Sequence, residues 1–446
     1  MRPLPIRRIF CVAILLLGAT FFAEQTEQER RRDIFRYGLE PEITELIASL
    51  QSEKSVEYDA DILALFGRTR TPALKETIIA FFASGKNDSL KQYSLDLLAD
   101  PYDARSTTVN AVLGYVAELK ISDAAPHIRK ILASDNSEYR DRAITTLGRI
   151  GTADDAQYLI EYLDGDLPGD EKQRLIIRQN VMDALGELRA IETWEKLSEI
   201  AQNPDENVMI RASAARAVGK MGKPEAIPVL SKLYEETDPV LRTASINALG
   251  NFSSPEATAL ILESFRDSYY KVRVEAIAAS ESRNLSEAVP YILYRAKSDP
   301  VEAVKVRAFE ALGKLNDSSG NDWLAAILAD DKIPDKMRVK AASVLLGQSF
   351  DAYYKRVEEV MLKTLKDDKK TWIRYELGKL VAGVQNQSSF PVANAFISHK
   401  DTLTRSLALD MYEKNRYPEM MAAVEAIAAD EKQGALQRRA KKILGK

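Results

Sequence analysis

The chain has 446 residues, of which 46% are hydrophobic and 29% are charged, and its formal net charge is −4. This composition supplies enough apolar material for a large core, which excludes a disordered chain. The slight acidity argues against nucleic acid as a partner, because binding to phosphates requires an excess of basic side chains.

The N-terminus has the layout of a signal peptide. Arg2, Arg7 and Arg8 precede an uncharged run from Ile9 to Ala23, and a basic stretch before a short apolar run is typical of secretory signals. A membrane-spanning helix needs roughly twenty apolar residues, more than this run offers. We therefore expect residues 1–23 to be cleaved and the chain to be periplasmic or secreted. The alternative is an uncleaved anchor in the inner membrane, with the chain facing the periplasm.

Cleavage would change both the charge and the redox chemistry of the chain. It leaves 59 basic and 66 acidic residues, a net charge of −7. It also removes Cys11, the only cysteine in the sequence. Neither disulfides nor thiolate metal sites are therefore expected to hold the mature chain together.

Two segments precede the regular part of the chain. Residues 24–37 are highly charged and are predicted to form a spacer or an exposed helix. Residues 38–104 show helical patterning, for example over 41–50, 60–66 and 74–82, but lack the phrase described next. Degenerate repeats of this kind are expected at the end of a repeat array, where the outer face must be polar.

From about residue 105 onwards, one ten-residue phrase returns along the chain. Clear copies end at Gly148, Gly186, Gly219 and Gly250, and weaker copies end at Gly114, Glu281, Gly313, Gly347, Gly378 and near Glu413. The interval between successive ends is the span of a two-helix unit. A second helix with a proline near its start follows the phrase, as in residues 226–234 and 288–296.

Each position of the phrase has a physical role. In the copy that ends at Gly219, the apolar or small residues are Val218, Ala217, Ala214 and Ile210. Their offsets fall on one face of a helix, and the small residues allow a neighbouring helix to approach closely. The terminal glycine is expected to take the left-handed conformation that ends a helix.

This phrase resembles the HEAT repeat, and more narrowly the short HEAT-like subtype first recognised in phycobilisome lyases. That subtype pairs a Val-Arg-x-x-Ala-x-x-Ala-Leu-Gly helix with an Ala-Val-Pro-x-Leu helix. The resemblance covers residues 105–380, and residues 381–446 are expected to hold degenerate repeats and a basic capping helix. It implies an all-α fold, an α-α superhelix (ARM/HEAT-type solenoid) of about ten helical hairpins. A fold of this kind says little about function.

A basic residue stands eight places before the end of most copies. This ladder consists of Arg140, Arg178, Arg211, Arg242, Arg273 and Lys305. One interpretation is an anion-binding stripe. The family resemblance implies a structural role, in which each base bridges to an acidic residue of the adjacent turn and ties the repeats together. We favour the structural role.

The sequence offers little for catalysis. Its two histidines, His127 and His399, belong to different repeats, and there is no His-Glu pair of the sort that HEAT-type di-iron hydroxylases use. No Cys-x-x-Cys motif or phosphate-binding glycine-rich loop is present either. We predict that the chain is not an enzyme, with no catalytic residue, no metal and no cofactor. A lyase or another enzyme on a HEAT frame is the least favoured alternative.

The remaining candidate for function is a surface. In a HEAT stack the second helices are expected to line the concave side, with the sixth residue after the leading alanine projecting away from the core. Those positions hold Lys130, Tyr162, Lys196, Lys232, Glu263 and Tyr294. Tyrosines and lysines repeated along one surface can contact an extended peptide or a partner helix, although they are also ordinary side chains of an amphipathic helix.

These observations predict a non-enzymatic, extracytoplasmic scaffold or adaptor that binds one or more protein partners along its concave surface. The alternative is a membrane-associated structural protein. It would be held by an uncleaved N-terminus, or by peripheral contact of the basic residues within 437–446 with an anionic membrane.

Overall fold

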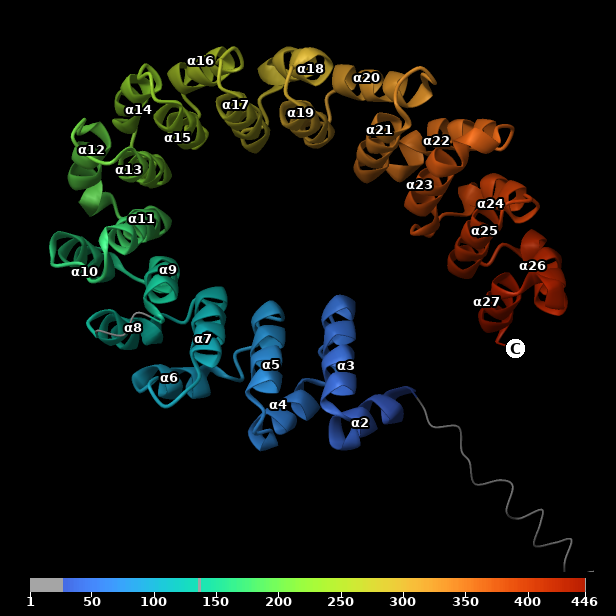
Figure 1. Ribbon diagram of the computed structural model, residues 1–446, viewed down its shortest axis with the longest axis horizontal. Coiled ribbons are helices and arrows are strands. Elements are labelled where there is room, and N and C mark those ends of the chain that lie inside the picture. Colours follow the sequence, from blue (N-terminus) through green and yellow to red (C-terminus); the bar gives the residue numbers. More distant parts are fainter. Residues whose placement is uncertain (1–26, 135–137, 446) are drawn as a thin grey trace, which may run out of the picture. The chain divides into compact units, whose positions relative to one another are not determined.

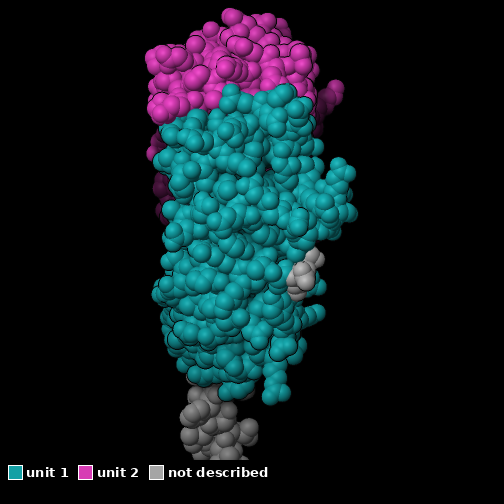
Figure 2. All heavy atoms as spheres, turned by 90° about the vertical axis from the view of Figure 1, so that its left-hand side faces the viewer, with its two compact units in different colours: residues 1–223 teal, residues 224–446 magenta. Residues whose placement is uncertain are grey.

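The computed structural model describes residues 27–134 and 138–445 of the chain, so the predicted signal peptide lies outside the described residues. Over these ranges the chain forms 26 α-helices, α2 to α27, and no strand. The all-α fold class is therefore confirmed. The helices belong to two compact units, Met1–Lys223 and Pro224–Lys446, which Figure 2 shows in different colours.

The first unit contains helices α2 to α13. Their bounds are α2 Glu27–Tyr37, α3 Glu40–Glu53, α4 Asp59–Arg68, α5 Pro72–Ser84, α6 Lys91–Ala99, α7 Ser106–Leu119, α8 Ala125–Leu132, α9 Arg140–Ile150, α10 Ala153–Asp164, α11 Glu171–Leu188, α12 Trp194–Gln202 and α13 Val208–Met221. Short 3₁₀ turns at Ser122–Ala124 and Ile191–Thr193 lead into α8 and α12.

The second unit contains helices α14 to α27. Their bounds are α14 Ala226–Tyr234, α15 Pro239–Leu249, α16 Pro255–Ser264, α17 Tyr270–Ser282, α18 Val289–Ser298, α19 Glu302–Leu315, α20 Ser318–Ala329, α21 Asp335–Gln348, α22 Phe350–Thr364, α23 Thr371–Ala382, α24 Phe390–Ile397, α25 Thr402–Asn415, α26 Met421–Ala429 and α27 Ala435–Leu444. Further 3₁₀ turns lie at Ser286–Ala288, Asp368–Lys370, Gln387–Ser389, Pro418–Met420 and Glu431–Gln433.

Helices alternate between two rows in each unit. The odd-numbered helices, which carry the repeated phrase, form an inner row on the hollow side of each unit, and the even-numbered helices form an outer row (Figure 1). The described helices make thirteen pairs, more than the ten or so expected. The additional inner helices, α3, α5 and α27, lie near the two ends of the array, where the phrase itself is absent.

The segment predicted as a charged spacer or an exposed helix is helical from Glu27 to Tyr37. Phe35 is its one buried residue, and its ring lies 6.0 Å from that of Tyr58. Helix α2 therefore packs against the array through this aromatic side chain and through ion pairs of Arg31 with Glu53 of α3 at 2.8 Å and of Arg32 with Asp61 of α4 at 3.8 Å.

Glycines of the phrase allow the inner helices to lie close together. A Cβ atom added to Gly148 of α9 would stand 2.6 Å from the Cα of Ala184 in α11, and one added to Gly186 would stand 2.9 Å from the Cα of Ala217 in α13. Real side chains do not tolerate such distances. Neither glycine has a positive φ angle, so the expectation that they end helices in the left-handed conformation is wrong. They serve close approach instead.

This close approach determines the direction in which each unit curves. Neighbouring inner helices, such as α9 and α11 or α15 and α17, contact each other more extensively than neighbouring outer helices do. A double row curves toward the row with the closer spacing, so the inner row lines the hollow side. The second helices of the repeats are therefore on the outer row, and the prediction that they line the concave side is wrong.

Over residues 27–134 and 138–445, no helix combines the length and the apolar character that crossing a lipid bilayer requires.

Candidate functional site

The longest repeat carries an insertion between α10 and α11. Its phrase ends at Gly186, and the interval from the preceding end at Gly148 is the largest between any two successive copies. Helix α11 starts two turns before its ladder residue Arg178, whereas α13, α15 and α17 start less than one turn before theirs. The backbone N–H of Gln173 donates to Asp170 at 2.8 Å and the Gln173 side chain accepts from the Asp170 N–H at 3.1 Å. This capping box fixes the early start of the helix.

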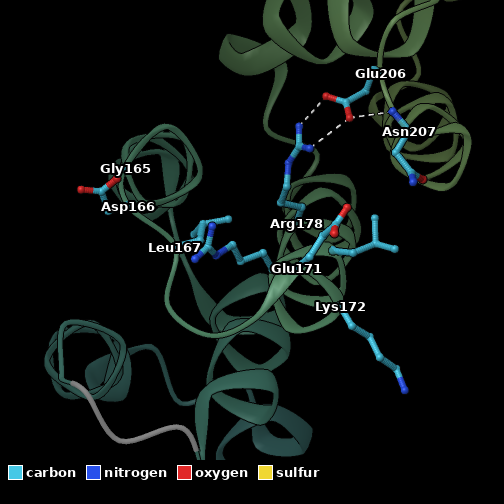
Figure 3. A pocket seen from close by; sticks show the side chains of 10 residues that line it. Gly165, Asp166, Leu167, Glu171, Lys172, Arg178, Glu206 and Asn207 are labelled. Carbon is cyan, nitrogen blue, oxygen red and sulfur yellow. Dashed lines mark hydrogen bonds and ion pairs between the residues drawn. The ribbon is translucent and has the colours of Figure 1, made fainter.

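The insertion forms one wall of an open cleft of about 840 Å³, which we call the α11 cleft (Figure 3). It is lined by Gly165, Asp166, Leu167, Glu171, Lys172, Arg174, Leu175, Arg178, Glu206 and Asn207. All of these residues belong to the first unit. The volume lies in the range of about 300 to 1,000 Å³ that is usual for ligand sites.

A second wall of the α11 cleft is formed by α11 and the turn before α13, and an ion pair joins these two elements. The two terminal nitrogens of Arg178 donate to the carboxylate of Glu206 at 3.0 and 2.5 Å, and that carboxylate also accepts from the backbone N–H of Asn207 at 2.8 Å. Hydrogen bonds from the Arg178 guanidinium hold the pKa of Glu206 below its usual range, against the opposing effect of burial. A bidentate pair of this kind fixes both orientation and distance.

The floor and rim of the α11 cleft differ in chemistry. Leu167 and Leu175 are half-buried, whereas Asp166, Glu171 and Lys172 are exposed. None of these three charged residues forms an ion pair within the described part of the chain. An apolar centre within a charged rim is the usual anatomy of a protein-binding surface. The lining contains no histidine, cysteine, serine or threonine.

Three ladder arginines pair with an acid in the turn before the next inner helix. Besides Arg178 with Glu206, Arg242 binds Asp267 at 2.8 and 3.1 Å. Arg273 binds Asp299 at 2.7 Å through both carboxylate oxygens. These contacts join consecutive repeats, which is the role that the family resemblance implies for the ladder.

Other arginines of the ladder donate hydrogen bonds to backbone carbonyl oxygens. Nε of Arg211 donates to the carbonyl of Ala201 at 3.1 Å, and Arg140 donates to the carbonyl of Ser134 at 3.5 Å. Lys305 is half-buried and has no ion pair among the residues that the structure describes. A lysine has no planar fork, and this rung lacks the bidentate contact that an arginine forms.

The ladder continues beyond Lys305 through arginines that the sequence analysis missed. Arg338 donates to the carbonyl of Leu328 at 3.0 Å. Arg374, which is fully buried, donates to the carbonyl of Thr364 at 2.6 Å and to the hydroxyl of Thr404 at 3.0 Å. Farther on, Arg405 donates to the carbonyl of Ile397 at 3.3 Å. The signal that could have found Arg338 and Arg374 is the spacing between arginines. Counting back eight places from Gly347 reaches Val339, next to Arg338, and counting back from Gly378 reaches Lys370, four residues before Arg374.

The six residues predicted to line the concave side lie on six successive outer helices, from α8 to α18. Lys130, Lys232, Glu263 and Tyr294 are exposed, whereas Tyr162 and Lys196 are half-buried. Tyr162 stacks on Tyr158 with 6.3 Å between ring centroids, and Lys196 pairs with Asp164 at 2.9 Å. Four of the six therefore project from their helices, but the outer row on which they lie faces away from the hollow side.

Within the described ranges, no group of three or more His, Cys, Asp or Glu side chains is arranged to hold a metal ion. His127 lies on α8 in the first unit and His399 lies between α24 and α25 in the second.

Two rows of helices, stacked in chain order and joined by a ladder of buried and half-buried basic residues, define the chain as a HEAT-repeat solenoid. A family model described as "Spirochaete HEAT repeat protein" matches residues 35–443. The chain belongs to this family.

Individual proteins are more distantly similar. Deoxyhypusine hydroxylase from Candida albicans is 23% identical over 286 residues, which cover 61% of this chain and 86% of that protein. The structure of human deoxyhypusine hydroxylase aligns with a TM-score of 0.28 and 16% identity, covering 67% of this chain and 99% of the other. The crystal structure of Kap121p aligns with a TM-score of 0.40 and 12% identity over 95% of this chain, which spans about half of Kap121p (52%). At these TM-scores the two structural likenesses carry no conclusion about function.

Proposed function

We propose that this chain is a non-enzymatic scaffold or adaptor that acts outside the cytoplasm and binds a protein partner at the α11 cleft. The observation that carries the proposal is the cleft itself, because an insertion into one repeat builds it. Insertions in repeat proteins map to loops on one face, often the binding face. The half-buried Leu167 and Leu175 supply the apolar centre of an interface, and the unpaired rim charges supply its specificity.

The residues of the chain support a role in binding a protein partner better than a role in catalysis. The likeness to deoxyhypusine hydroxylase raises an enzymatic alternative, but the sequence has only two histidines and no His-Glu pair of the HEAT-type di-iron hydroxylases. Bidentate ion pairs such as Arg178 with Glu206 join consecutive repeats. The features that remain available for binding a partner are the shape of the surface, its apolar area and its charge.

Export from the cytoplasm is supported by the basic and then apolar layout of the segment from Met1 to Ala23. Mass spectrometry of the mature N-terminus, from protein purified out of the native cell envelope, tests it. A start near Glu24 is expected. An intact N-terminus would instead favour the anchored alternative.

The cleft is tested by site-specific crosslinking followed by a binding measurement. A photoreactive amino acid placed at Leu175 should crosslink one partner protein in cells, and the same amino acid at the exposed Leu403 of α25 should not. With that partner purified, Leu167→Ala/Leu175→Ala should weaken binding at least about tenfold, or about 1.4 kcal/mol, as expected for the centre of an interface. The matched control is Val306→Ala/Leu403→Ala, which trims two exposed apolar residues of the second unit. Equal affinities for the two double variants would refute the assignment.

A further inference from the structure

The second unit carries a separate groove that is lined only by aromatic, proline and arginine residues. It has a volume of about 470 Å³ and is formed by Arg266, Pro290, Tyr291, Tyr294 and Arg295. We call it the Tyr–Arg groove. Tyr294 is 58% exposed.

Both tyrosines support a guanidinium group. The guanidinium carbon of Arg295 lies 5.0 Å from the centroid of the Tyr294 ring, and that of Arg266 lies 5.9 Å from the Tyr291 ring. The Tyr291 ring in turn packs at 5.5 Å against Phe265, which is completely buried. The groove is therefore anchored on the core, and cation–π contacts hold its two guanidinium groups near the rings before any ligand binds.

The two arginines of the groove keep hydrogen-bond donors available. Arg266 forms no ion pair in the described part of the chain. Arg295 reaches Asp299 only at 3.4 Å, and the oxygens of Asp299 already accept from Arg273 at 2.7 Å and from the N–H of Val301 at 2.9 Å. Arg266 is exposed, and the side chain of Arg295 is 18% exposed. Two such guanidinium groups with no acid in the lining favour a ligand with carboxylates, which guanidinium groups bind in bidentate fashion.

We propose that the Tyr–Arg groove docks a short acidic peptide segment of a protein partner. Carboxylates of the segment would bind Arg266 and Arg295, while an apolar side chain between them would lie on Tyr294 and Pro290. A long polyanion fits less well, because the chain as a whole is acidic, with a net charge of −4, and only two cations line the groove. The proposal rests on the proposed scaffold function, but it concerns a different unit and a different surface from the α11 cleft.

Binding of a defined peptide to the full chain tests this assignment directly. The probe is a fluorescein-labelled Glu-Asp-Phe-Glu-Asp peptide, followed by fluorescence anisotropy. Its control is the Gln-Asn-Phe-Gln-Asn peptide, which has the same shape without the carboxylates. The acidic peptide should bind at least about tenfold more tightly than the amide peptide, and its affinity should fall on raising NaCl to about 0.3 M, which screens the charge pairs.

Variants then locate the binding surface. Arg266→Gln/Arg295→Gln should weaken binding of the acidic peptide at least about tenfold, and Tyr294→Ala should weaken it about threefold or more. The matched control is Arg438→Gln/Lys441→Gln, which removes two exposed cations of α27, and its affinity should stay within about twofold of the parent. Arg295→Lys keeps the charge but loses the fork, so it should fall between the parent and the double variant.

Three outcomes would overturn the proposal: equal binding of the acidic and amide peptides, an equal loss in the groove and α27 variants, or binding of phosphatidylglycerol vesicles through the groove without binding of the peptide. The last outcome would identify a membrane surface as the occupant. Leu167→Ala/Leu175→Ala serves as the control for the other site and should leave peptide binding unchanged. Failure of the groove and failure of the α11 cleft are thus distinguishable.

Discussion

Replacing Arg273 with alanine should destabilise the second unit strongly. Arg273 and Asp299 are 5% and 1% exposed, so solvent hardly screens their interaction. The substitution removes two 2.7 Å hydrogen bonds to Asp299 and two more, at 2.9 and 3.1 Å, to the carbonyls of Asp267 and Ser268. Removing one partner of a buried ion pair typically costs about 3 to 5 kcal/mol. We expect the lower end, about 3 kcal/mol, because Arg295 and the N–H of Val301 still face Asp299.

The chain contains a matched control for this experiment. Lys305 occupies the same ladder position one repeat later and has no ion pair among the described residues, so Lys305→Ala should change stability by less than about 0.5 kcal/mol. Urea unfolding of each full-length variant, followed by circular dichroism, gives the comparison. Hydrogen exchange of α17 and α19 reports whether the loss is local, which matters because long repeat arrays need not unfold in one step.

A double variant separates the buried charge from lost packing. If the cost of Arg273→Ala comes from leaving Asp299 ionised and unpaired, adding Asp299→Asn should restore part of the stability. Equal stability losses for Arg273→Ala and Lys305→Ala would refute the reasoning, as would a double variant less stable than Arg273→Ala alone.

Two further predictions concern the pH dependence of stability and the close approach of inner helices at Gly148. Burial opposes ionisation of Asp299, but hydrogen bonds from Arg273 and the Val301 N–H outweigh it and lower its pKa, and Arg178 lowers the pKa of Glu206. A carboxyl whose pKa is lower in the folded state stabilises the fold above its unfolded value, taken as 3.8 for Asp and 4.5 for Glu, and loses that contribution as the pH falls further. Melting temperatures recorded from pH 7 to 3 should therefore drop steeply below about pH 4.5, and less steeply in Glu206→Gln/Asp299→Asn; parallel curves would contradict this. Gly148→Ala should cost about 1 to 3 kcal/mol in urea unfolding, because the new methyl overlaps Ala184, whereas Gly347→Ala, whose Cβ meets nothing within 4 Å, should be neutral or stabilising by up to about 1 kcal/mol. Similar losses in both would count against close helix approach as the reason for Gly148.

The repeated phrase was sufficient to predict the fold class and most of the arginine ladder, because both depend on periodicity within single helices. Counting from the glycines misplaced the later rungs. In α23 the place at which the phrase should end, counted forward from Arg374, is Ala382, and Gly378 lies one helical turn earlier. The arginine, which must reach a fixed partner in the next turn, is the better anchor for aligning the repeats.

The direction of curvature depends on a comparison between two rows, which no single helix displays. The direction of curvature depends on small residues, Gly148 with Ala184 and Gly186 with Ala217. These residues can be read from the sequence, but which row they bring closer together is seen only in the structure. For the same reason, the prediction that Tyr294 projects from its helix is correct, but the prediction that it faces the concave side is wrong, because its helix belongs to the outer row. The α11 cleft left a signal in the long interval between Gly148 and Gly186, although the cleft itself requires Glu206 and Asn207 from the following repeat.

The unequal spacing of the two rows has a mechanical consequence within each unit. Inner helices are in close contact at Gly148 and Gly186, so we expect the inner row to resist compression. The outer helices contact each other less, so we expect them to separate more readily. Each unit should therefore bend mainly by changes in the spacing of its outer helices, while the spacing of its inner helices stays nearly constant. A partner that inserts a side chain between two outer helices would store elastic energy there and alter the spacing of every repeat nearby.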